Sequence, residues 1–207
     1  MSSTEAGGRP GARRLVDACF ESLDAAAALL DAEPSLLVAR DGLGETALHY
    51  LAVENQLAAV QWLFARGAAL DTVSDVQGSP LSEAASLGYE ELVGWLLDHG
   101  ASIELPGQGE PALIEAARGG HAAIVARLLA AGADVGSING IRETALHVAC
   151  SNDAGLAVVE VLLAAGAPLD ARRIFDETPL DVAIDEGAER IVELLRRCGA
   201  TSQRQAD

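Results

Sequence analysis

The chain has 207 residues, of which 50% are hydrophobic and 3% aromatic, and its formal net charge is −17. This acidic excess argues against a phosphate-backbone partner, so we expect no nucleic-acid binding and favour a basic protein partner. No apolar run reaches the roughly 18 residues of a membrane-spanning helix. The first residues also lack the apolar core of a secretory signal, so we expect a cytoplasmic protein without a membrane partner.

The basic residues indicate the kind of genome that encodes the protein, and the cysteines indicate the redox state of its thiols. All basic residues are arginine, and this lysine-free, Ala- and Gly-rich usage fits a GC-rich bacterial genome. Cys19, Cys150 and Cys198 are odd in number, widely spaced and set in apolar helical stretches. We interpret them as reduced thiols in or near the core, rather than as disulfide or metal ligands.

The N-terminal region predicts a tail followed by two helices. Residues 1–11 are rich in Gly and Ser, which indicates a flexible tail. One helix is expected from Ala12 and a second from about Leu23 to Ala32, before Pro34. This pair lacks the signature of the later helices. We therefore interpret residues 12–40 as a degenerate repeat that covers the apolar end of an array.

From residue 41 onwards the sequence repeats with a period near 33. The first anchor is a leucine, at intervals of 33, 32, 33 and 34 residues: Leu48, Leu81, Leu113, Leu146 and Leu180. The second is a glycine after a leucine-rich run, at intervals of 33, 32, 34 and 33: Gly67, Gly100, Gly132, Gly166 and Gly199. Two independent anchors with one period predict a repeat array, which we divide into 41–73, 74–105, 106–138, 139–172 and 173–200.

Each copy carries the start and stop signals of two short helices. A hydroxyl residue stands where it can cap the first helix: Thr46, Ser79, Thr144 and Thr178. A residue that tolerates a left-handed conformation predicts the turn between the helices: Asn55, Gly88, Gly120 and Gly187. The anchor glycine then predicts the end of the second helix.

Three copies depart from this pattern. The third has Pro111 in the capping slot and a short finger before it, so we expect this finger to be the least regular. The fourth has an extra residue near Asp153 and Gly155, which predicts a bulged turn. The fifth has Arg196 where the fourth has leucine, as suits a terminal repeat without a neighbour, and residues 201–207 are expected to form a tail.

The motif Asp-x-x-Gly-x-Thr-Ala-Leu-His at 41–49, with Leu-Leu-x-x-Gly-Ala at 128–133 and 162–167, resembles the ankyrin repeat. The resemblance implies an all-α, ankyrin-repeat solenoid of stacked helix-turn-helix units with hairpin or loop fingers. It also implies protein–protein recognition without catalysis. The family's glycine two residues before the threonine slot is replaced by Gln77, Arg142 and Asp176, so tilted fingers are expected there.

No constellation of side chains predicts catalysis, a metal site or a cofactor. His49 and His147 occupy the histidine slot, for which the resemblance implies a bond to neighbouring loop backbone, and they lie three repeats apart. His99 and His121 fall at a helix stop and a turn, where solvated imidazoles are common. No His and Cys pair has zinc-ligand spacing, and no Gly-rich loop has a phosphate-binding context.

The remaining candidate site is an inner strip formed by the finger tips and the exposed side of each first helix. Its finger residues are Leu43, Val76, Gln108, Ile141, Ile174 and Phe175, and just before the capping slots lie Glu45, Gly78, Glu110, Glu143 and Glu177. The glutamates are expected to form an acidic ladder, either as simple solvation of the fingers or as part of an interface. Candidate residues on the first helices and the turns after them are Tyr50, Val53, Glu54, Glu83, Ser86, Leu87, Glu115, Arg118, Ser151, Asn152, Asp185 and Glu186.

Apolar residues beside charged ones are what an interface needs, so Phe175 is the expected anchor. We therefore expect a monomeric, non-catalytic module that binds a protein through the concave inner strip, with a basic partner favoured. The alternative is an inhibitor or immunity-type protein that blocks a basic enzyme or toxin, motivated by the charge and small size. An enzyme and a self-associating structural protein are the less favoured readings.

Overall fold

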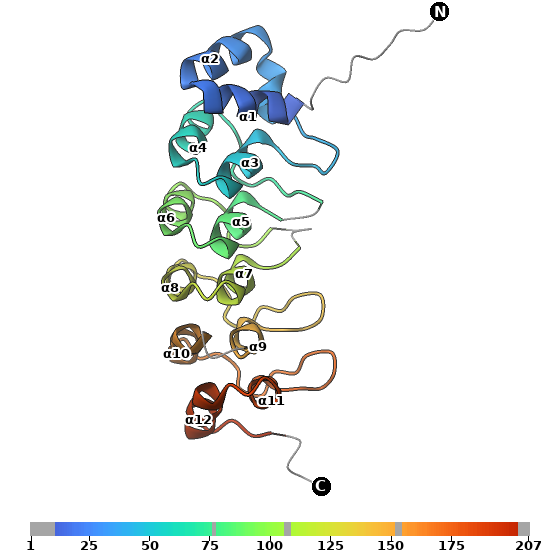
Figure 1. Cartoon of the computed structure of the whole chain (residues 1–207), viewed down its shortest axis with the longest axis vertical. Helices are drawn as coiled ribbons and strands as arrows, with labels where there is room; N and C mark the ends of the chain where they lie inside the picture. The colour runs from blue at the N-terminus through green and yellow to red at the C-terminus, as the bar shows by residue number, and fades with distance from the viewer. Residues whose placement is uncertain (1–10, 76–77, 106–108, 152–154, 203–207) are drawn as a thin grey trace, which may run out of the picture.

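The computed structural model describes residues 11–75, 78–105, 109–151 and 155–202, and its helices form two parallel rows (Figure 1). The first row is α1 (Gly11–Glu21), α3 (Ala47–Val53), α5 (Pro80–Ser86), α7 (Ala112–Arg118), α9 (Ala145–Ala149) and α11 (Pro179–Asp185). The second row is α2 (Leu23–Ala32), α4 (Leu57–Phe64), α6 (Glu90–Asp98), α8 (Ala122–Ala130), α10 (Leu156–Ala164) and α12 (Glu189–Arg197). Finger loops project to one side of the stack, which confirms the all-α solenoid.

Each helix pair buries its apolar face against the pairs before and after it. The repeated leucines are buried in every copy, and α5, for example, packs against both α3 and α7. Small buried residues such as Ala84, Ala85 and Ala116 let the first-row helices approach closely. At the N-terminal end, α1 packs against α3, and α2 and the 3-10 helix η1 (Pro34–Val38) pack against α1, with Leu15 and Leu36 buried.

The predicted hydroxyl caps open four of the first-row helices. The Thr144 N–H donates to Nδ1 of His147 over 3.2 Å, and the His147 N–H bonds back to Oγ1 of Thr144. Ser82 and Asp181 replace the histidine as partners of Ser79 and Thr178. These reciprocal bonds satisfy N–H groups that a helix start leaves free.

The third copy lacks this arrangement. Pro111 stands at the start of α7 and makes no side-chain cap. Gly109, two residues before Pro111, does not take the left-handed conformation that Gly44 has in the first finger, at φ +75. Both features agree with the expected irregularity, although residues 106–108 lie outside the described chain.

The turns follow the predicted glycine and asparagine signals. The anchor glycines at the ends of the second helices all have positive φ, as do the turn residues Asn55, Gly88, Gly120 and Gly187. In the fourth copy, Asp153 lies outside the described residues. Gly155 there presses against the end of α9, because a Cβ at this position would lie 2.0 Å from the carbonyl oxygen of Ala149.

Four fingers close with the same backbone bond, in which the first residue donates to the carbonyl four positions on. The donor and acceptor pairs are Asp41 and Glu45, Ser74 and Gly78, Asn139 and Glu143, and Arg173 and Glu177. Successive fingers also bond to each other, since Asp75 donates to Leu43 and Ile174 donates to Ile141. The fingers are therefore loops, with one isolated bridge between Ser74 and Gly78 among the described residues.

The expected tilt of the glycine-free fingers is wrong for the last two. Arg142 at φ 64 and Asp176 at φ 60 adopt the left-handed conformation that Gly44 has in the first finger. The closing bonds hold these residues in the conformation despite the clash of a Cβ with the backbone. The replacement thus adds strain and leaves the shape unchanged, while Gln77 lies outside the described residues.

Two further sequence expectations are tested by the described chain. Cys150 is buried and Cys19 half-buried, but Cys198 is exposed, so the prediction of a near-core thiol is wrong for Cys198, which lies at the end of α12 on the outer face of the described stack. Arg196 is exposed at the same end, as predicted. The repeat boundaries and the two tails stay predictions, because residues 1–10 and 203–207 are not described.

We predict that Arg142→Gly stabilises the protein by about 0.5–1 kcal/mol, because glycine relieves the left-handed strain at the expense of some chain entropy. Chemical denaturation measures the free energy of unfolding. Arg142→Ala is the matched control, since it removes the same side chain and keeps the Cβ. An equal gain in both variants would show that the arginine side chain, and not the backbone, is responsible.

Candidate functional site

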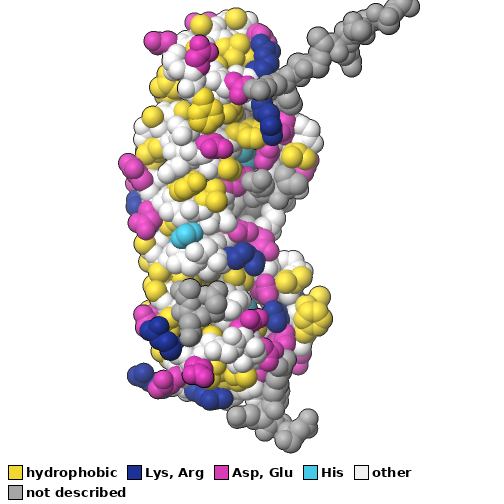
Figure 2. Space-filling view, viewed as in Figure 1, with side chains coloured by type: hydrophobic (Ala, Val, Ile, Leu, Met, Phe, Trp, Pro, Cys, Tyr) yellow, Lys and Arg dark blue, Asp and Glu magenta, His cyan; other side chains and the backbone are white. Residues whose placement is uncertain are grey.

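The tips of the last two fingers present large apolar side chains to solvent. Ile141, Ile174 and Phe175 are 48%, 57% and 77% exposed, and we call these three residues the fingertip patch. The backbone bond from Ile174 to Ile141 is 3.1 Å long and places the two tips side by side. Yellow side chains protrude from these lower fingers in Figure 2. Leu43 is exposed on the first finger, whereas Val76 and Gln108 lie outside the described residues.

The expected solvated acidic ladder is wrong. Glu45 and Glu143 are buried, and Glu110 and Glu177 are half-buried. Donors from the next repeat reach two of these side chains, since Arg173 bonds to Glu143 and Asn139 bonds to Glu110. These glutamates therefore act mainly as structural groups and offer little free charge at the surface.

Arg173 is the centre of this acidic row. Its Nη1 lies 2.9 Å from Glu143 of the preceding finger, and its Nε lies 2.7 Å from Glu177 of its own finger. All three side chains are at least three-quarters buried. One guanidinium thus joins two fingers by charge-assisted hydrogen bonds, from the residue that precedes Ile174 of the fingertip patch.

The same polar row continues towards the third copy through Asn139. Its amide donates to Glu143 and to Glu110, each over 3.2 Å, and Glu110 also holds Arg118. Asn139 and Arg173 were not among the sequence candidates. Each of them lies four residues before a ladder glutamate, as Asp41 does before Glu45. This spacing was the signal in the sequence by which they could have been found.

We predict that Arg173→Ala lowers the free energy of unfolding by about 2 kcal/mol, since two enclosed carboxylates lose a charged donor. Arg172→Ala is the matched control. Arg172 pairs with Asp176, whose side chain is 78% exposed, so its loss should change stability by less than about 0.5 kcal/mol. Denaturant titration compares the two variants, and similar losses for both would contradict the assigned role of Arg173.

A second part of the inner strip is a pocket of about 370 Å³ over the first-row helices. Val53 of α3, Glu83 of α5 and Leu87 line it, together with the finger residue Glu110 and Glu115 of α7. Glu83 was expected at the surface and is only 5% exposed. Among the described residues, neither of its carboxylate oxygens has a hydrogen-bond partner.

The state of the Glu83 carboxyl follows from its surroundings. Burial, and next the negative charge of Glu45, raise the pKa of Glu83 to about 8. The adjacent serines are already engaged, because Ser82 bonds to Ser79 and Ser86 donates to Glu115. Glu83 is therefore largely protonated at neutral pH and becomes a buried negative charge as the pH rises.

The stability of the protein should reflect this shift. The folded pKa lies above the ordinary value of 4.5, so stability from Glu83 is fully present below pH 4.5 and is lost as the pH rises through 8. We predict that the melting temperature of Glu83→Gln, relative to wild type, rises by about 5 °C or more between pH 5 and pH 9. Exposed Glu91→Gln is the control, and a pH-independent difference for Glu83→Gln would refute the shift.

The remaining candidates of the inner strip divide by exposure. Leu87, Arg118 and Ser151 are exposed, as are Glu54, Asp185 and Glu186, while Val53, Ser86 and Glu115 are half-buried. Tyr50 is half-buried, and its hydroxyl donates to Asp41 and accepts a hydrogen bond from Arg13. Burial, and next the bond to Asp41, raise the pKa of Tyr50. Tyr50 therefore links α1 to the first finger, and Asn152 lies outside the described residues.

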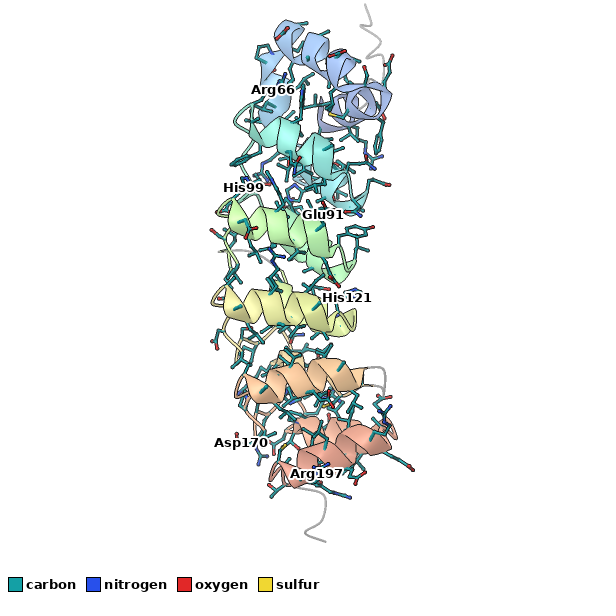
Figure 3. The ribbon with its side chains drawn as sticks, turned by 90° about the vertical axis from the view of Figure 1, so that its left-hand side faces the viewer. Arg66, Glu91, His99, His121, Asp170 and Arg197 are labelled. Atoms are coloured by element: carbon teal, nitrogen blue, oxygen red, sulfur yellow. The ribbon has the colours of Figure 1, made fainter. Side chains whose placement is uncertain are left out.

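The histidines have structural roles. Nε2 of His147 donates to the carbonyl of Glu177 over 3.1 Å, and His49 bonds in the same way to Gly78, so each imidazole ties a helix start to the next finger. Burial lowers the pKa of both rings. His121 is not simply solvated, because it bonds to the carbonyl of Ser86 in the preceding repeat. On the second-row face seen in Figure 3, His99 stacks on Trp95.

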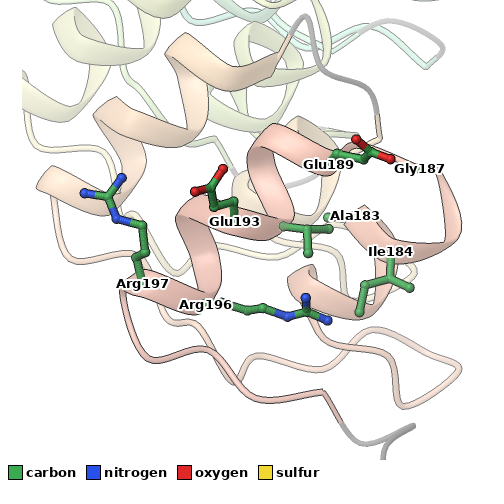
Figure 4. A pocket seen from close by; sticks show the side chains of 8 residues that line it. Ala183, Ile184, Gly187, Glu189, Glu193, Arg196 and Arg197 are labelled. Carbon is green, nitrogen blue, oxygen red and sulfur yellow. The ribbon is translucent and has the colours of Figure 1, made fainter.

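A cavity of about 660 Å³ opens at the C-terminal end of the stack between α11 and α12. Figure 4 shows Ile184 on one side and Glu193 and Arg196 on the other. In a stacked array this is the face against which a neighbouring repeat packs, and we interpret it as the end face of the described stack.

The described residues show neither a cluster of metal ligands nor a helix suited to span a membrane. Within that part of the chain, no group of three or more His, Cys, Asp or Glu side chains is placed to hold a metal ion. No described helix has both the length and the apolar character required to cross a bilayer.

Stacked helix pairs with projecting fingers define a repeat protein of the solenoid class. A family model described as ankyrin repeats (3 copies) matches residues 15–107 and 113–206, and the chain belongs to this family. It is 36% identical over 122 residues to the human ankyrin repeat and SOCS box protein 16, covering 54% of this chain and 27% of that protein. Ankyrin repeats are generally protein–protein interaction modules and are typically non-catalytic.

A second relative, from Caenorhabditis elegans, is a transient receptor potential cation channel subfamily A member 1 homolog. It is 33% identical over 125 residues, which are 60% of this chain and 10% of that protein. The chain thus matches only about a quarter or less of the length of these two relatives. The likeness concerns the repeats.

Proposed function

We propose that the protein is a non-catalytic module that binds a protein partner through its inner strip, with the fingertip patch as the anchor. The observation that carries this proposal is the exposure of Ile141, Ile174 and Phe175 side by side on two bonded fingers. Large apolar side chains are seldom left together in water without a partner. Aromatic anchors supply a large share of the energy of many interfaces.

The polar row below the patch supports the proposal. Arg173 and the closing bonds hold the two fingers together, so the patch is presented in a fixed arrangement. Charged groups surrounding an apolar centre are typical of protein interfaces. The side chains of the ladder glutamates are largely paired. The proposed interface is therefore apolar at the finger tips and polar at the finger bases.

The net charge of −17 favours a basic partner. A long-range acidic field increases the rate of association with a positive surface and makes that rate fall as salt is added. We also propose that the protein is a monomer, that it acts in the cytoplasm and that it does not bind nucleic acid. This attraction of a basic partner depends on the net charge of the whole molecule rather than on the glutamate ladder.

We predict that Phe175→Ala weakens binding of the partner by about 30-fold, as expected for the loss of about 2 kcal/mol at an aromatic anchor. The partner is first isolated with wild-type protein from the native host, and affinities are then measured by calorimetry with purified components. Phe20→Ala is the matched control, because Phe20 is also an exposed phenylalanine but lies on α1, outside the fingers. Equal affinities for wild type and Phe175→Ala would exclude the fingertip patch as the interface.

A further inference from the structure

The pocket above Glu83 has the construction of a binding site rather than of a gap between helices. Val53 and Leu87 provide apolar walls, and Glu110 and Glu115 stand at its polar side. Glu83 is enclosed to 95%, yet neither of its oxygens is hydrogen-bonded among the described residues. A buried carboxyl group without a partner loses free energy, and a ligand that supplies donors would restore it.

The neighbouring side chains do not relieve Glu83, since they are committed elsewhere. Ser82 donates to the Ser79 carbonyl at 2.9 Å, and Ser86 donates to Glu115 at 3.0 Å. Arg118, a cation in the same region, is already paired with Glu110. The pocket therefore contains an excess of acceptors, and its occupant must bring positively charged donors.

We propose that this pocket binds an arginine side chain of the protein partner, with the guanidinium on Glu83. The aliphatic part of an arginine fits between Val53 and Leu87, while its planar head offers two parallel N–H groups to the two free oxygens of Glu83. Arginine suits this site better than lysine because a guanidinium is planar, less strongly hydrated and able to bond a carboxylate twice.

The charges around the pocket set its pH dependence. Glu45 faces Glu83 from the segment before α3, Glu110 comes from the finger before α7, and Glu115 comes from α7 itself. Burial and Glu45 keep the pKa of Glu83 near 8, so a cation must bind together with loss of a proton at neutral pH. Affinity should therefore rise about tenfold per pH unit below pH 8 and level off above it.

The inference deepens the proposed function and rests on it for the biological occupant, but the pocket can be tested by itself. The probe is N-acetyl-arginine amide, titrated into the full chain labelled with ¹³C and ¹⁵N. The neutral isostere N-acetyl-citrulline amide and N-acetyl-lysine amide are titrated in parallel. The readout is the carboxyl ¹³C shift of Glu83 with the amide shifts of α5.

We expect saturable shifts with arginine, with an affinity in the millimolar range that a single side chain provides. Citrulline should bind at least tenfold more weakly, and lysine should bind more weakly than arginine. Glu83→Gln should reduce arginine affinity at least tenfold and abolish the pH dependence between pH 6 and pH 8. Glu91→Gln, a change on the second-row helix α6 (Figure 3), should have no effect.

Equal binding of arginine and citrulline, or unchanged arginine affinity in Glu83→Gln, would overturn the proposal. Lysine affinity equal to that of arginine would overturn the assignment to a guanidinium. Circular dichroism of Glu83→Gln establishes that the variant is folded, and the wild-type pH series tests the pocket without any substitution.

The outcomes for the two proposals are distinguishable. If Phe175→Ala abolishes partner binding while the arginine probe gives no shifts, the fingertip patch stands and the pocket fails. If the probe binds as expected while Phe175→Ala leaves partner affinity unchanged, the pocket stands and the proposed interface at the tips fails.

Discussion

A helix pair of this size buries its apolar side only against another pair, and this constraint organises the whole molecule. The first-row helices are short, so most of their stability comes from packing and capping rather than from helix propensity. Small residues such as Ala84 and Ala116 bring the pairs into close contact. The imidazoles of His49 and His147 then connect the starts of α3 and α9 to the fingers that follow them. Finger position is thus a consequence of helix stacking.

The fold could be predicted from sequence because its determinants are local and repeated. A hydroxyl cap, a turn residue and a glycine stop each act within a few residues, and their recurrence reinforces the assignment. Even the exception at Pro111 was visible, since a proline has no hydroxyl to cap a helix. The left-handed Arg142 and Asp176 were misjudged because their conformation is imposed by closing bonds rather than by intrinsic preference.

The candidate site was only partly predictable, because burial and pairing depend on residues about 30 positions apart. Glu143 reads as a surface charge in the sequence, yet Arg173 from the next repeat encloses it. Glu83 likewise occupies an apparently exposed face of a short helix and is covered by neighbouring elements. In contrast, the exposure of Phe175 and Ile174 followed directly from their place at a finger tip.

The junction of the last two fingers has a thermodynamic consequence for association. Arg173 bridges Glu143 and Glu177, and the Ile174 bond joins the tips above it, so backbone motion there is restricted before a partner arrives. Binding to such a surface sacrifices little conformational entropy, and the desolvation of the apolar tips then appears mainly as a negative change in heat capacity. The stiffness of the two loops would in this way lower the entropic cost of forming a complex.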